Sequence, residues 1–381
     1  MRNCPLCLSA DNKVIVERSR VPVLQNVIVR TKQEALEFPT GRLTICSCRN
    51  CGFVWNAAFD PAAIDYGATY NNSVQASRVY LQHQAAMAER VLAGGEELHY
   101  LEIGCGEGEF IDALDKTGRL KSAVGFDPAF HGNYDFGPHI TIYREYFDAG
   151  SAARLPDRIN TVCSRHTIEH VPDPRAFMAE IARFVRERSV RLFMETPDVS
   201  WILERAAFED FFYEHCSLYS PRSIAYLLAE FGLRCRVDLV YDGQYMWIEA
   251  EADGQATLPA AVDGSDDDVA ERLTQALDRW RDQIDRLRSR GPLAIWGAAS
   301  KGVTFALLLD GVDYAVDLNL QQQGGFLPVS GVPVVSPEAA QQAGVATLLV
   351  MNPIYEQEIR RQVADMSWDA QVISLRAEAA N

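Results

Sequence analysis

Hydrophobic and polar positions alternate with two different periods along the 381 residues, and the changes of period divide the chain into regions. Residues 76–250 alternate helical and strand patterns, beginning with a helix over Arg78–Leu92 and a strand over Tyr100–Ile103. Such alternation is typical of a parallel, doubly wound sheet. Residues 1–75 instead hold short strand-like runs between turn residues, namely Val14–Val16, Val27–Arg30 and Leu43–Cys46. We therefore predict a small β-rich module before a larger α/β domain.

Residues 251–290 connect this domain to another one. Residues 252–267 are rich in small and acidic residues, which predicts a linker, and Val269–Ser289 carries apolar residues at helical spacing. Residues 291–381 then resume an α/β pattern, with a strand over Leu293–Trp296, a glycine-rich turn and a helix. The predicted fold class is α/β, with an N-terminal module, a central doubly wound sheet and a C-terminal Rossmann-like domain.

Composition and charge narrow the functional classes. The formal net charge is −16, whereas nucleic-acid binding needs clustered Lys and Arg to contact phosphates. No apolar run reaches the roughly 18 to 20 residues that span a membrane. The first residues also lack the apolar stretch of a signal peptide. We expect a cytoplasmic protein that acts on a small molecule, without nucleic acid or membrane as a partner, and we favour a monomer.

Four of the nine cysteines form two C-x-x-C motifs, Cys4–Cys7 and Cys48–Cys51. Each such turn directs two sulfurs to one point, and two turns complete a tetrahedral Cys4 shell for zinc. Because no coordination position stays open, the predicted zinc is structural. Cys46 competes with Cys48 for the site, although the spacing favours Cys48; reduced, buried cysteines are the alternative to any metal.

A glycine-rich run, Leu101–Phe110, follows a hydrophobic strand and opens a helix. Gly104, Gly106 and Gly108 permit a tight turn that lets a ligand approach the backbone closely. Asp127 ends the next strand about twenty residues later, where doubly wound folds bind a ribose diol. A purely structural glycine turn is the alternative. With Glu102 ending the first strand, the E-x-G-C-G-x-G form resembles class I methyltransferases, which bind S-adenosylmethionine.

Two further segments carry titratable side chains. His166, Glu169 and His170 follow a predicted strand, at the end where such sheets bind ligands. Farther along, Tyr213-Glu214-His215 lies among aromatic residues and can form a proton-transfer site. A histidine that only makes hydrogen bonds in the core is the alternative in both places.

The turn Trp296-Gly-Ala-Ala-Ser-Lys301-Gly302 begins the first helix of the C-terminal domain. Amides at a helix N-terminus favour anions, and Lys301 adds a positive charge. A Rossmann-like turn without a ligand is the alternative.

Together these motifs resemble a family, the bacterial deoxysugar C-methyltransferases that act on nucleotide-linked keto-sugars. The resemblance covers nearly the whole chain and implies an N-terminal zinc-binding domain, a central S-adenosylmethionine domain and a C-terminal Rossmann-like domain. It rests on the paired C-x-x-C motifs and on the following segments: Tyr70–Ser73, Glu102–Gly108, His170–Asp173, Glu195–Pro197, Tyr213–His215, Trp296–Gly302, Asp317–Asn319, Gly325–Pro328, and Asn352 with Glu358-Ile359.

The resemblance also implies residue roles. The family's base falls on His215, with Tyr213 and Glu214 beside it, a second active-site histidine falls on His170, and a tyrosine of the N-terminal domain falls on Tyr70. Three departures from the family pattern lie where the substrate would bind: Arg165 to His170 replaces N-x-x-x-H, Asn71-Asn72 replaces a more aromatic stretch, and Gln321 to Gln323 replaces a proline and a lysine.

We therefore expect His215 to remove a proton next to a keto group, Tyr213 and His170 to stabilise the resulting oxyanion, and Glu214 to orient a partner. The residues expected at the cofactor are Glu102, Gly104, Gly106, Glu107, Gly108, Asp127, Phe147 and His166. Those expected at the substrate are Lys301, Asn352 and Glu195. Two alternatives remain open: methylation of O, N or C of another small molecule, and a non-catalytic scaffold that senses the cofactor.

Overall fold

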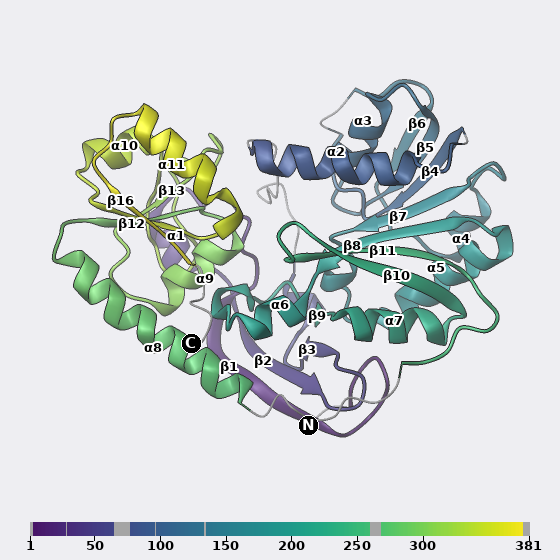
Figure 1. Cartoon of the computed structure of the whole chain (residues 1–381), viewed down its shortest axis with the longest axis horizontal. Coiled ribbons are helices and arrows are strands. Elements are labelled where there is room, and N and C mark those ends of the chain that lie inside the picture. The colour runs from purple at the N-terminus through teal and green to yellow at the C-terminus, as the bar shows by residue number, and fades with distance from the viewer. Residues whose placement is uncertain are drawn as a thin grey trace.

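The computed structural model describes residues 3–27, 29–64, 77–95, 97–132, 135–259 and 268–375. Within these ranges the strands form three sheets of four, seven and five strands (Figure 1). No helix in the described part of the chain is long and apolar enough to cross a membrane.

The first sheet is antiparallel and has the order β1-β2-β3-β9. Its strands are β1 (Asn12–Pro22), β2 (Thr40–Cys48), β3 (Val54–Asn56) and β9 (Ser217–Leu218), with helix α1 (Lys32–Leu36) before β2 and the 3-10 turn η1 (Pro61–Ala63) after β3. β9 arrives from more than 150 residues farther along the chain and pairs Leu218 with Val54. The N-terminal sheet is therefore completed by the segment that carries His215.

The central sheet has the order β10-β11-β8-β7-β4-β5-β6 and is parallel except for β11. Every residue of β7 is buried, as in parallel strands that are covered on both faces. Buried side chains of α2 and α3 pack on one face, and those of α5 and α7 pack on the other. The strands are β4 (Leu98–Ile103), β5 (Leu120–Phe126), β6 (Ile140–Tyr143), β7 (Thr161–Arg165), β8 (Arg191–Pro197), β10 (Leu233–Val240) and β11 (Tyr245–Ala252). The helices are α2 (Arg78–Leu92), α3 (Glu109–Asp115), α4 (Ala149–Ala153), α5 (Pro174–Arg188) and α7 (Pro221–Glu230), with the 3-10 turn η2 (Ile168–His170).

The third sheet is wholly parallel, in the order β14-β13-β12-β15-β16. Side chains of α10 and α11 cover one face, while α8 and α9 contribute to a core on the other. The strands are β12 (Leu293–Trp296), β13 (Tyr314–Val316), β14 (Val334–Val335), β15 (Thr347–Val350) and β16 (Gln371–Ser374). The helices are α8 (Val269–Arg288), α9 (Ser300–Leu308), α10 (Pro337–Gln342) and α11 (Glu356–Asp365), with the 3-10 turn η4 (Pro353–Tyr355).

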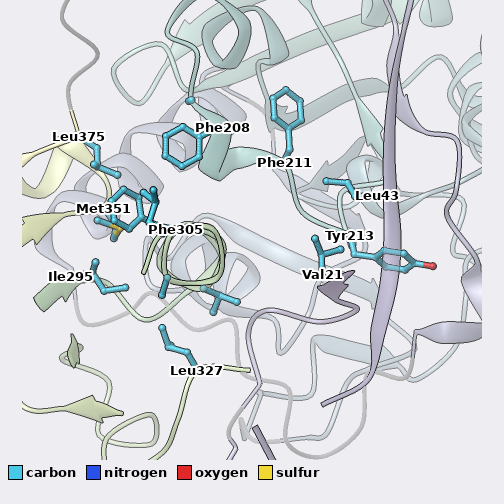
Figure 2. Close-up of a cluster of buried hydrophobic side chains, with 14 of the residues drawn as sticks. Val21, Leu43, Phe208, Phe211, Tyr213, Ile295, Phe305, Leu327, Met351 and Leu375 are labelled. Carbon is cyan, nitrogen blue, oxygen red and sulfur yellow. The ribbon is translucent and has the colours of Figure 1, made fainter. Parts of the chain in front are cut away.

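One hydrophobic cluster joins the N-terminal and C-terminal sheets to the segment that follows β8 (Figure 2). That segment comprises α6 (Val199–Glu204) and the 3-10 turn η3 (Phe208–Asp210). Phe305 of α9 lies at the junction, with its ring centroid 6.0 Å from that of Phe208 and 5.7 Å from that of Trp280 in α8. Arg18 of β1 adds polar contacts, because its guanidinium donates to the carbonyl oxygens of Phe208 and Phe211 at 2.6 and 2.7 Å.

The predicted α/β class and doubly wound central sheet are confirmed, as are the helix Arg78–Leu92 and the strand Leu293–Trp296. The predicted linker begins too early, because β11 continues through Ala252. Within the predicted strand Val27–Arg30, Val29 forms only an isolated bridge, and its partner is Phe326 of the C-terminal region. The bridge and β9 both cross the domain boundaries that the sequence predicts. The N-terminal region therefore packs against the central and C-terminal regions and is not an independent domain.

We predict that Phe305→Ala destabilises the protein by about 3 to 5 kcal/mol, since it leaves a cavity where three elements meet. Denaturant unfolding followed by circular dichroism measures this loss. Leu320→Ala is the control, because Leu320 is 80% exposed and should change stability little. Equal effects of the two substitutions would contradict a shared core at this point.

Candidate functional site

A cleft of about 1410 Å³ lies where the carboxyl ends of the central and C-terminal sheets face each other. Gly104 and His166, which directly follow β4 and β7, line one side of it. Gly297 and Met351, which directly follow β12 and β15, line the other. Carboxyl ends of parallel strands are the usual ligand sites of such sheets, and here two of them share one cavity.

The glycine-rich turn between β4 and α3 forms part of this cleft, and its three glycines have different structural roles. All three have positive φ, at 74°, 55° and 87° for Gly104, Gly106 and Gly108. A Cβ on Gly104 would overlap the side chain of Thr167, and one on Gly108 would lie 2.6 Å from Phe136. A Cβ on Gly106 would meet no atom within 4 Å. Gly104 and Gly108 therefore allow close packing, whereas Gly106 borders open space where a ligand can approach.

Two carboxylates lie beside this turn, of which Glu102 is buried and Asp127 is partly buried. Asp127 accepts the N–H groups of Gly106 and Ala129, each at 2.8 Å, and burial raises its pKa. Glu102 is 2% exposed, and burial raises its pKa to about 8. One carboxylate oxygen of Glu102, Oε2, is buried without a hydrogen-bond partner. Both residues line the cleft and offer acceptors to hydroxyl or ammonium groups of a ligand.

Glu107 and Phe147, also predicted for this half of the cleft, line it as well. Glu107 Oε1 accepts the main-chain N–H of His131 at 2.9 Å. Phe147 packs its ring against Phe126 and Phe184, with centroids 5.5 and 6.2 Å apart. The first residue fixes a loop at the rim of the cleft, and the second forms part of its apolar wall.

The two predicted active-site histidines meet in the cleft. The rings of His170 and His215 are nearly perpendicular, with centroids 4.8 Å apart. Burial lowers the pKa of His215 well below its usual value, and His170, His166 and Lys301 lower it further. A lowered pKa favours the neutral form of the His215 ring, which is the form that accepts a proton.

Glu169 joins this pair; the sequence places it with His166 and His170 at the end of a strand but gives it no catalytic role. Its carboxylate and one ring nitrogen each of His170 and His215 lie within 4.8 Å of one another. The short turn η2 places Glu169 and His170 next to each other, and both line the cleft. The only sequence signal for Glu169 is its position directly before His170 in a run at the end of a strand.

The residues next to His215 differ in whether they line the cleft. Glu214 is 1% exposed, and its Oε1 accepts the N–H of Gln25 at 2.7 Å, which ties the N-terminal region to the site. Tyr213 instead belongs to the hydrophobic cluster (Figure 2), and its hydroxyl oxygen accepts the N–H of Asp60 at 2.9 Å. Tyr213 does not line the cleft, so the expected contact with an oxyanion is not met. Phe212 faces His215 there, with ring centroids 4.1 Å apart.

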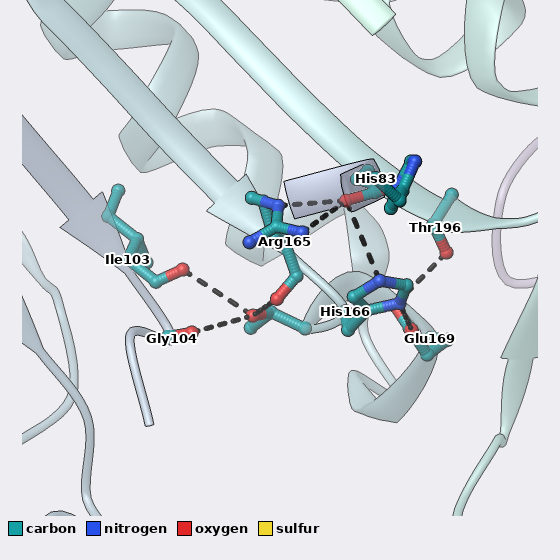
Figure 3. A network of polar contacts seen from close by, with 9 residues as sticks. His83, Ile103, Gly104, Arg165, His166, Glu169 and Thr196 are labelled. Atoms are coloured by element: carbon teal, nitrogen blue, oxygen red, sulfur yellow. Dashed lines mark hydrogen bonds and ion pairs between the residues drawn. The ribbon is translucent and has the colours of Figure 1, made fainter. Parts of the chain in front are cut away.

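A buried ion-pair network joins Arg165, His83 and His166 to Glu195 (Figure 3). Arg165 Nε donates to Glu195 Oε2 at 2.8 Å, Arg165 Nη2 lies 2.7 Å from the same oxygen, and His83 contacts the other oxygen. Although burial alone raises the pKa of Glu195, Arg165 and His83 together hold it well below its usual range. Glu195 is fully buried and does not line the cleft. The expectation that Glu195 binds substrate is therefore corrected: Arg165 and His83 occupy both of its oxygens.

His166 sits between two acidic groups rather than in open space. Its Nδ1 is 3.4 Å from Glu169 Oε1, and its Nε2 is 3.6 Å from Glu195 Oε2. Its φ of 49° lies in the left-handed region that residues other than glycine seldom adopt. The ring also lies 4.7 Å from that of Tyr245, and both residues line the cleft.

The two residues predicted to bind substrate from the C-terminal domain also line the cleft. Lys301 forms an ion pair with Asp210, and its ammonium lies 5.0 Å from the centre of the Trp201 ring. Asn352 accepts from the side chain of Gln244 at 3.0 Å. Tyr70, predicted to reach the site from the N-terminal domain, lies outside the described residues.

The four cysteines of the C-x-x-C motifs converge outside the cleft. Cys4 and Cys51 have sulfurs 3.7 Å apart, and the sulfurs of Cys7 and Cys48 are 3.5 Å apart. Sulfurs held about 2.3 Å from one tetrahedral ion lie roughly 3.8 Å from each other, so the group could hold a metal ion. Cys46 is buried in β2 and is not part of this cluster.

Comparison with known proteins finds two matching families and a similar C-methyltransferase. Residues 41–236 match a family described as a methyltransferase domain, and residues 267–375 match one described as a C-methyltransferase C-terminal domain. C-methyltransferase NovU of Streptomyces niveus is 26% identical over 274 residues, which cover 63% of this chain and 63% of that protein.

Solved structures with a similar fold include two proteins of Burkholderia thailandensis. An O-methyltransferase family protein has a TM-score of 0.38 and 15% identity, over 46% of this chain and 57% of that one. A 1,6-didemethyltoxoflavin-N1-methyltransferase has a TM-score of 0.36 and 13% identity, over 47% of this chain and 83% of that one.

Proposed function

We propose that this protein methylates a carbon atom of a nucleotide-linked keto-deoxysugar. The premise is that the chain belongs to the methyltransferase-domain family and is an S-adenosylmethionine-dependent enzyme with a class I fold. The observation that carries the proposal is the pair of neighbouring histidines, His170 and His215, in the same cleft as the glycine-rich turn. The match of residues 267–375 to a C-methyltransferase C-terminal domain supports carbon as the acceptor. Membership of an enzyme family favours catalysis over a cofactor-sensing scaffold.

The cofactor fits the carboxylate acceptors beside the glycine-rich turn. Asp127 would bind its ribose hydroxyls, and the unpartnered oxygen of Glu102 would accept from a further donor. Gly106 leaves room for close approach, and Phe147 supplies an apolar wall. When bound, S-adenosylmethionine supplies an electrophilic methyl group, which a carbon atom attacks only as a carbanion or enolate.

His215 is the base in this proposal. A keto group next to the reacting carbon makes the proton removable, and a neutral imidazole at the site can take it. The N–H of His170, on the neighbouring ring, would donate to the enolate oxygen as negative charge develops there. Glu214 holds the His215 segment against Gln25, so that the base keeps its direction. We leave Tyr213 out of the mechanism because its hydroxyl is bound to Asp60.

Lys301 and Asn352 would bind the nucleotide part of the substrate. In the described structure Lys301 is paired with Asp210, so a phosphate group would have to replace that carboxylate. The helix start next to Lys301 offers main-chain amides to the same anion. Tyr70 remains a predicted contributor from the N-terminal domain.

The cysteine cluster is proposed to hold a structural zinc ion, since four sulfurs leave no coordination position for a substrate. We predict about one zinc per chain in freshly purified protein. Cys48→Ser should lower both the zinc content and the yield of folded protein, whereas Cys46→Ser should retain the metal. Metal analysis without zinc in the wild-type protein would refute this site.

For the cofactor, we predict that Asp127→Ala weakens binding of S-adenosylmethionine by about 1 to 3 kcal/mol, through loss of hydrogen bonds to a charged acceptor. Isothermal titration calorimetry measures this difference. Asp157→Ala is the control, because the Asp157 side chain is fully exposed at the surface. Unchanged affinity in Asp127→Ala would mean that other groups hold the ribose.

For the base, we predict that His215→Ala reduces turnover of a keto-sugar nucleotide by about 10² to 10⁴, while the affinity for S-adenosylmethionine stays nearly constant. The same variant should lose exchange of the substrate proton with solvent deuterium when the cofactor is omitted. His139→Ala is the control, since His139 pairs with Asp115 outside the cleft.

Comparison with His170→Ala shows which of the two histidines is the base and which stabilises the oxyanion. If His170 only stabilises the oxyanion, its loss slows turnover less than the loss of His215. Loss of exchange in His170→Ala with exchange preserved in His215→Ala would mean that the two roles are exchanged. If neither substitution affects turnover, an oxygen or nitrogen acceptor of another small molecule becomes the better account.

A further inference from the structure

Glu169 is a buried carboxylate with a hydrogen bond at one oxygen and none at the other. Its side chain is 1% exposed, and its Oε2 accepts the hydroxyl of Thr196 at 3.0 Å. Its Oε1 is buried without a hydrogen-bond partner. Buried polar atoms nearly always have a partner, because leaving one unpaired costs about 1 to 3 kcal/mol. The missing hydrogen bond at Oε1 therefore indicates that this oxygen has a functional role.

The groups nearest to this oxygen are imidazole rings. His166 Nδ1 is 3.4 Å away, and one ring nitrogen each of His170 and His215 lies within 4.8 Å of the carboxylate and of each other. A neutral imidazole carries its proton on one nitrogen and a lone pair on the other. A carboxylate that accepts the N–H at one end of the ring fixes the lone pair at the other end.

We propose, resting on the function proposed above, that Glu169 is a positioning residue for the histidine pair. Its Oε1 accepts a ring N–H of the pair, which leaves the opposite nitrogen of the base unprotonated toward the substrate. Its negative charge also stabilises the imidazolium that forms when the base has taken a proton. Hydrogen bonds of this kind are often long in a protein without substrate and shorten when the substrate binds.

A purely structural role fits the contacts less well. A carboxylate that only joined η2 to β8 would accept a hydrogen bond at both oxygens, whereas Glu169 accepts one from Thr196 and has only the 3.4 Å contact with His166 Nδ1 at the other. Thr196 instead fixes the carboxylate so that the other oxygen remains on the side of the rings. Several titratable and charged groups face His215 within the described residues. From the central domain they are His166, Glu169, His170 and the adjacent Glu214, and from across the cleft they are Lys301 and its partner Asp210.

The first test reads the ring tautomers directly and needs no substrate. Nitrogen NMR of histidine-labelled protein at neutral pH should show a single tautomer for the His170 and His215 rings, assigned with the single alanine variants. Glu169→Leu should convert at least one ring to a mixture of tautomers. His139, which pairs with Asp115 outside the cleft, serves as the internal control for an intact fold. Unchanged tautomers in Glu169→Leu would overturn the proposal.

The second test uses turnover. Glu169→Gln should reduce kcat by at least about 10-fold with little change in KM for the sugar nucleotide. Because a nearby negative charge favours the imidazolium form, its removal lowers the pKa of the base, and the acidic limb of the rate profile should move about one unit to lower pH. Glu169→Asp should restore the position of the limb. A uniform loss of rate at every pH, as in a merely weakened structure, would overturn the proposal.

The two tests separate this inference from the function on which it rests. If no keto-sugar is enolised by the wild-type protein, the proposed function fails, while the tautomer measurement still decides the role of Glu169. A metal ion is the other occupant that this donor set could take. A second equivalent of metal, retained in Cys48→Ser and lost in Glu169→Gln, would show that Glu169 is a ligand and overturn the positioning role.

Discussion

The shared hydrophobic core around Phe305 is the constraint on which the rest of the structure depends. It packs α9 against η3 and α8, and through η3 it reaches the N-terminal sheet (Figure 2). The chain that leaves η3 carries His215 and then enters the N-terminal sheet as β9. His215 is thus held between a core on one side and a strand pairing on the other, and close-packed side chains do not shift without an energetic cost.

Burial around the cleft gives its polar groups their chemical character. In a low dielectric, charges are kept only where they are paired, as Arg165 and Glu195 are, and neutral forms are favoured elsewhere. Glu102 has a raised pKa and His215 a lowered one for this same reason, namely desolvation. A neutral imidazole next to a fixed carboxylate, Glu169, follows from the fold as much as from the residue types.

Much of the candidate site could be predicted because several of its signals are local. The cofactor turn depends on residues close in sequence, where Gly104, Gly106 and Gly108 meet backbone requirements that few other residues satisfy. The prediction failed for side chains whose direction depends on distant partners. Tyr213 and His215 are two positions apart, yet one enters the core and the other the cleft, because Asp60 and the surrounding apolar side chains hold the tyrosine.

By itself, the sequence determined the order of helices and strands, the glycine turn, the cysteine motifs and the presence of two candidate histidines, since these follow from periodicity and short-range geometry. Only the tertiary structure decided which polar residues face the cleft. It paired Glu195 with Arg165 and His83 in the interior, and it brought Glu169 to the histidines. The physical reason is that burial and hydrogen-bond partners are set by chain segments far apart in sequence, whose contacts exist only after the sheets have packed together.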